Sequence, residues 1–181
     1  SAIQGVESLA VYENDTDNPT ITIDGEVANI PAHSFTVVIL GGEPTTIANT
    51  IWNNKPVGIT SNGNTTVDIL DSQGFSHLIG FERPTPVTIY IDLELDTNEQ
   101  FPGNGAALIK AAIIEYAKEN FSVGKDIIYS RLYTPINSIL GHAINSFTLG
   151  ESPSPSGTAN IPISFNEIGS FESVNITIST V

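Results

Sequence analysis

Three histidines, His33, His77 and His142, are the side chains whose unperturbed pKa lies nearest neutrality. A general base or a metal ligand would be sought among them first. They fall in different segments, and no two are spaced four residues apart, as a helical metal site would need. Cysteine is absent, which excludes disulfides, thiolate metal sites and cysteine nucleophiles. The sequence therefore predicts no catalytic residue, no metal ligand and no cofactor.

The pair Gly41-Gly42 separates an apolar run from a helical pattern, which is where a phosphate-binding loop would stand. However, Glu43 follows directly, at the position where the phosphate would bind. No Lys-Ser or Lys-Thr follows the glycines, so neither nucleotide-binding fingerprint is matched. We interpret this passage as a tight turn from strand to helix.

Two further groups of residues suggest binding chemistry. Asp68 and Asp71 flank a turn, but one pair lacks the repeated oxygen ligands of a calcium loop. Trp52 and the five tyrosines could stack against sugars. The helical spacing around Trp52 places it on the core-facing side, so burial is the favoured interpretation.

The chain carries six basic and twenty acidic residues, a formal charge of -14. This balance argues against nucleic-acid partners, because their phosphates are bound largely by Lys and Arg. No apolar run approaches the roughly 20 residues of a membrane-spanning helix, so we expect no membrane span.

The first half of the chain alternates strand and helix signals. Alternating or β-branched residues predict strands at residues 5–12, 21–23, 35–40 and 65–70, and a second hairpin arm at residues 75–81. Ile47, Ala48, Ile51 and Trp52 recur at helical spacing, which predicts a helix over Pro44–Asn54. Two prolines, Pro84 and Pro86, then predict an extended junction.

The second half begins with strict alternation over residues 87–95, which predicts a half-buried strand. Helices are predicted at residues 106–121 and 130–140, the second kinked by Pro135. Leu108 is expected in the core stripe of the first. Strands are predicted at residues 143–149, 160–165 and 173–179. We therefore expect an α+β protein with two small subdomains, residues 1–84 and 85–181.

The order of these segments resembles the baseplate J-like family of contractile phage tails, of the Mu-like prophage type. The run is a Val-Leu-Gly-Gly strand, a helix, a Gly-Ile-Thr segment, an Asp-x-x-Gly turn and a Phe-x-Arg-Pro exit. In this chain the corresponding stretches are Val37-Val-Ile-Leu-Gly-Gly42, Ile47-Ala48-Asn-Thr-Ile51, Lys55-Pro56-Val-Gly58-Ile59-Thr60, Asp71-Ser-Gln-Gly74 and Phe81-Glu-Arg83-Pro84. The second half is similar to the family at Ile109-Lys110-Ala111-Ala112-Ile113, Gly124, Ser130-Arg-Leu132-Tyr133, Ile136 and Gly141.

The resemblance covers roughly residues 30–181 and implies a non-enzymatic wedge subunit of the tail baseplate. Its partners would be other baseplate proteins and its own copies. It would reside in the virion, and in the host cytoplasm during assembly. The resemblance also implies that the family's amino-terminal part is absent from this chain. Two alternatives stay open: a carbohydrate- or receptor-binding tail module, and a cell-wall hydrolase with a cleft of converging titratable groups.

Overall fold

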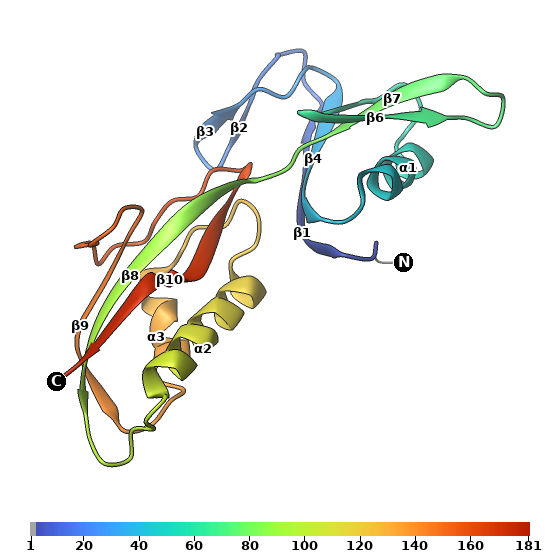
Figure 1. The fold of residues 1–181 in the computed structure, drawn as a ribbon. Helices are drawn as coiled ribbons and strands as arrows, with labels where there is room; N and C mark the ends of the chain where they lie inside the picture. The colour runs from blue at the N-terminus through green and yellow to red at the C-terminus, as the bar shows by residue number, and fades with distance from the viewer. Residues whose placement is uncertain (1–2) are drawn as a thin grey trace. The chain divides into compact units, whose positions relative to one another are not determined.

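The computed structural model describes residues 3–181, which form a mixed α+β protein, as the sequence predicts (Figure 1). The chain divides into two compact units. Unit 1 comprises Ser1–Thr85 with Ser164–Glu167, and unit 2 comprises Pro86–Ile163 with Ile168–Val181. The short segment Ser164–Glu167 belongs to unit 1 although most of unit 2 precedes it in the sequence. The two units are therefore not separated by one boundary along the chain. No helix within residues 3–181 is long and apolar enough to cross a membrane.

Unit 1 is built from short strands and one helix. Its elements are β1 (Val6–Asn14), β2 (Ile21–Ile23), β3 (Glu26–Ala28), β4 (Ser34–Gly41), α1 (Pro44–Asn54), β5 (Thr60–Asn62), β6 (Thr65–Leu70) and β7 (Ser76–Phe81). β4 is the central strand of a sheet in the order β1-β4-β5, antiparallel to β1 and parallel to β5. β2–β3 and β6–β7 form separate antiparallel pairs.

The segment Ser164–Glu167 completes unit 1 through polar and aromatic contacts. The side-chain amide of Asn166 donates to the Glu82 carboxylate at 2.8 Å, and its backbone carbonyl accepts from Thr85 N at 2.9 Å. The ring of Phe165 packs edge-on against Tyr12, with centroids 5.4 Å apart. Aromatic pairs favour this geometry over face-to-face stacking.

Unit 2 holds the larger core. Its elements are β8 (Thr85–Thr97), α2 (Gly105–Asn120), a 3₁₀ turn at Tyr129–Leu132, α3 (Tyr133–Ile136), β9 (His142–Gly150) and β10 (Glu167–Thr180). β8 is central in the order β10-β8-β9. Ile89, Ile91, Leu93 and Leu95 of β8 are buried against α2, while Tyr90, Asp92 and Glu94 are half-exposed, so the alternation in the sequence is confirmed.

Several predictions about unit 2 are wrong. Residues 160–165 form no strand; only an isolated bridge joins Ile161 to Ile127, and Pro162 lacks the N–H that a ladder needs. The helix predicted at residues 130–140 ends at Ile136 and begins as a 3₁₀ turn. Leu108 is 39% exposed rather than in the core stripe of α2.

Candidate functional site

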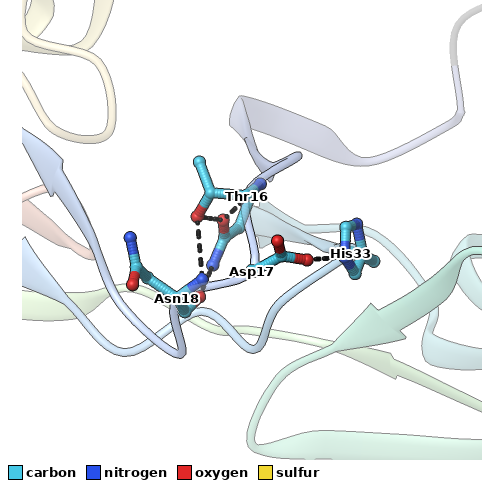
Figure 2. A network of polar contacts seen from close by, with 5 residues as sticks. Thr16, Asp17, Asn18 and His33 are labelled. Carbon is cyan, nitrogen blue, oxygen red and sulfur yellow. Dashed lines mark hydrogen bonds and ion pairs between the residues drawn. The ribbon is translucent and has the colours of Figure 1, made fainter.

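The three histidines lie in separate environments. His33 Nε2 is 2.9 Å from the exposed carboxylate of Asp17, beside a loop that Thr16 and Asn18 stabilise (Figure 2). Asn14, which is fully buried, accepts from Thr16 N and donates to the backbone oxygen of Asn18. The polar contacts of His33 therefore belong to a loop-stabilising network.

His77 lies on β7 and contacts both an aspartate and the only tryptophan. Its Nε2 is 3.0 Å from Asp71 Oδ2, and its ring stacks on Trp52 with centroids 4.0 Å apart. Asp71 also accepts from the backbone N–H groups of Gln73 and Phe75, so it closes the β6–β7 turn. The hydrogen bond from His77, followed by that from Phe75, lowers the pKa of Asp71.

His142 is at the start of β9. Both ring nitrogens are buried without a hydrogen-bond partner, and the ring lies edge-on to Phe101, with centroids 6.0 Å apart. Within residues 3–181, no group of three His, Asp or Glu side chains lies close enough together to hold a metal ion. The structure thus does not bring the three histidines together.

The turn at Gly41-Gly42 leads into α1, and the helix is capped from within. The Glu43 carboxylate accepts from Thr45 N at 3.0 Å and from Thr46 N at 2.8 Å, and these bonds lower its pKa. The first N–H groups of α1, which a phosphate would need, are thus bonded to Glu43. This geometry agrees with the interpretation of the passage as a strand-to-helix turn.

Arg83, which follows β7 and is distant from this turn only in the sequence, stabilises the turn by direct contacts. Its guanidinium donates to the backbone oxygens of Ile39 at 3.1 Å and Gly42 at 2.9 Å, and also to that of Gly41. Its Cζ lies 5.0 Å from the ring centroid of the buried Phe81. The sequence identified Arg83 only as part of a motif, because carbonyls 41 to 44 residues away cannot be inferred from spacing.

Trp52 is half-buried rather than fully in the core. It packs against the buried cluster of Ala48, Ile69 and Ile79, and Lys55 Nζ lies 5.2 Å from its ring centroid. Together with His77 it lines a pocket of about 260 Å³. One face of the indole is covered by the imidazole, which reduces the ring surface available to a ligand.

A larger apolar groove of about 420 Å³ lies on unit 1, between the β1–β4 face and α1. β1 contributes Leu9, Val11 and Glu13, β4 contributes Phe35, Val37 and Ile39, and α1 with the following loop forms the other side. Leu9 and Val11 remain 54% and 59% exposed, although they stand opposite Ile39 and Val37 in the ladder. An apolar face left this open is typical of a binding surface.

A β-bulge precedes the residues of β1 that line this groove. The register shifts between Val6 and Ser8, so that Glu7 is an extra residue opposite β4. Val6 consequently shares a face with Leu9 and Val11, although the three are not evenly spaced in the sequence. The sequence identified them only as a strand signal.

Comparison of the chain with protein-family models finds no match, and neither does comparison with curated proteins.

Proposed function

We propose that the chain is a structural module of a phage contractile-tail baseplate, a non-enzymatic wedge subunit that acts through interfaces. Its partners are other baseplate proteins and copies of itself. It resides in the virion, and in the host cytoplasm during assembly. The setting rests on the ordered sequence resemblance. The mode of action rests on one structural observation, the open apolar groove of unit 1. Covering this apolar surface with a partner would remove it from water, which lowers the free energy.

The residues that carry the resemblance in the first half of the chain lie at turns and contacts of unit 1. The Val-Leu-Gly-Gly run forms β4 and the turn into α1, and the exit arginine is Arg83, whose guanidinium donates to that turn. The Asp-x-x-Gly stretch is the β6–β7 turn closed by Asp71. These positions explain why such residues are needed for folding. Interface specificity would then come from exposed positions such as Leu9 and Val11.

The test is incorporation of the full-length protein into tails. Val11→Asp places a charge in the groove at a side chain that is already 59% exposed, so folding should survive while assembly falls. Val174→Asp is the matched control, since Val174 is 82% exposed and belongs to unit 2. Tails that incorporate both variants equally well would contradict the proposal.

A second function, a carbohydrate- or receptor-binding tail module, draws support from Trp52. The indole is half-exposed beside a pocket that Lys55 and His77 also line. Aromatic rings with neighbouring polar groups suit sugar recognition. Glycan-array binding that is lost in Trp52→Ala, with the circular dichroism spectrum unchanged, would favour this function over assembly.

A further inference from the structure

We infer that the outer edge of β1 and the adjoining groove bind an extended segment of another protein as an added strand. We further infer that this segment carries Lys or Arg beside alternating apolar residues. The inference rests on the proposed assembly function and specifies the chemistry of the partner. It follows from three properties of β1: its backbone, its side chains and its charge.

The backbone of β1 offers hydrogen-bonding groups at its outer edge. On the other side of β4, Ile39 N donates to Glu82 O at 2.9 Å, and Glu82 N donates to Val37 O at 2.8 Å. Val37 and Ile39 therefore direct their backbone groups away from β1. In an antiparallel ladder the residues opposite them, Val11 and Leu9, direct theirs to the outer edge.

At Leu9 and Val11 the outer edge of β1 pairs with no further strand of the described residues, since the sheet order ends at β1. Native proteins usually shield such an edge, because its N–H and C=O groups form a template for another strand. Addition of a strand from a partner is an established mode of peptide recognition.

The side chains of the same residues line the groove. Leu9, Val11 and Glu13 all project into it, and the first two are more than half exposed. Side chains alternate along a strand, so every second residue of an added strand would reach the groove. A partner with apolar residues at those alternate positions would bury both its own side chains and those of β1.

The charged residues beside this edge indicate the charge of the segment that would bind there. Glu7 and Glu13 are exposed, flank Leu9 and Val11, and form no ion pair within residues 3–181. The two basic residues of unit 1 are hydrogen-bonded to backbone carbonyls and pair with neither glutamate. Lys55, on the α1 side of the groove, donates to Ile59 O at 2.9 Å, and Arg83 donates to Ile39 O at 3.1 Å.

A second copy of β1, paired antiparallel, would bring these carboxylates close to their counterparts, and two chains of charge -14 repel. A segment bearing Lys or Arg would instead be attracted by these carboxylates. The electrostatics therefore favour a cationic strand from another protein over self-pairing.

The experiment uses a synthetic heptapeptide, Lys-Thr-Val-Thr-Leu-Thr-Val, titrated into the chain and followed by NMR chemical shifts. Paired antiparallel to β1, it sets its Lys opposite Glu13 and its Val and Leu over the groove. N-methylation of the odd positions removes the N–H groups that face β1 and should weaken binding at least about tenfold. N-methylation of the even positions is the matched control and should change the affinity by less than about threefold. Glu13→Lys should reverse the preference between this peptide and its Lys→Glu analogue.

Equal effects of odd and even methylation, or no binding of the peptide, would overturn the inference. So would dimerisation of the chain, seen by sedimentation and lost in Val11→Asp, because that would make a second copy the occupant. The proposed function can fail separately. If the peptide binds as expected but Val11→Asp still enters tails, the strand site stands and the baseplate role falls. If no peptide binds but Val11→Asp fails to enter tails, the reverse holds.

Discussion

Replacing Arg83 with alanine should destabilise unit 1 more than any other single change of charge on its surface. The guanidinium is half-buried and donates to the backbone oxygens of Ile39, Gly41 and Gly42, where β4 turns into α1. A hydrogen bond to a charged group contributes about 1.5–3 kcal/mol net when buried. Partial exposure screens these bonds, and the carbonyls regain some water in the variant. We therefore expect a loss of about 2–4 kcal/mol, including the contact with the ring of Phe81.

Urea unfolding followed by tryptophan fluorescence is the suitable assay, because the only tryptophan, Trp52, is in unit 1. With a urea dependence of about 1.5 kcal/mol per M, the midpoint for Arg83→Ala should fall by roughly 1.3–2.7 M. Arg83→Lys should lose an intermediate amount, since one ammonium cannot reach the same carbonyls in the same planar arrangement.

The control is Arg131→Ala, which removes the same charge from an exposed position in unit 2. Surface changes of this kind usually stay within about 0.5 kcal/mol, so the Trp52 transition should not move. A fall of less than about 0.3 M for Arg83→Ala would refute the argument that this guanidinium stabilises the turn.

Three further predictions test the geometry of unit 1. Ala10→Pro should cost roughly 1–3 kcal/mol more than Val11→Pro in urea unfolding, because only the N–H of Ala10 faces β4. Gly41→Ala should cost at least about 1–2 kcal/mol, since φ is +77° and a Cβ would overlap a backbone carbonyl of the facing loop. His77→Ala should raise the pKa of Asp71 toward its ordinary value of about 3.9, observable by carbon NMR of the carboxyl. In the parent protein the lowered pKa of Asp71 stabilises the folded state above about pH 4. This stabilisation is lost as the pH falls through the lowered pKa. The free energy of unfolding of His77→Ala should therefore fall less on acidification than that of the parent protein.

The elements that the sequence predicts well are those with strong local signals. α1 and β6 match their predicted bounds, because Pro44 suits the first helical turn, Lys55-Pro56 ends the helix and Asp71-Ser-Gln-Gly74 makes a turn in any context. The strict alternation after Pro86 likewise predicts β8 and its buried face. In each case the physical cause lies within a few residues of the element itself.

The elements that the sequence misses depend on partners far along the chain. β5 is a polar three-residue strand that exists because Ser34–Thr36 of β4 offers it a parallel edge. Residues 160–165 contain apolar residues at alternate positions, yet make a single bridge, to Ile127. Strand formation in such segments is decided by pairing and burial rather than by propensity.

The groove could not be inferred from the sequence for a related reason. Val6, Leu9 and Val11 suggest a strand buried on one side, but the bulge at Glu7 and the position of α1 decide what covers them. The cover is partial, and the sequence carries no local sign of that. The sequence does not distinguish Glu7 and Glu13 from the other acidic residues of a chain of charge -14. The structure places their carboxylates on either side of Leu9 and Val11, at the open edge of β1. They discourage pairing between identical copies while leaving the edge open to a cationic segment, so they would contribute to specificity rather than to stability.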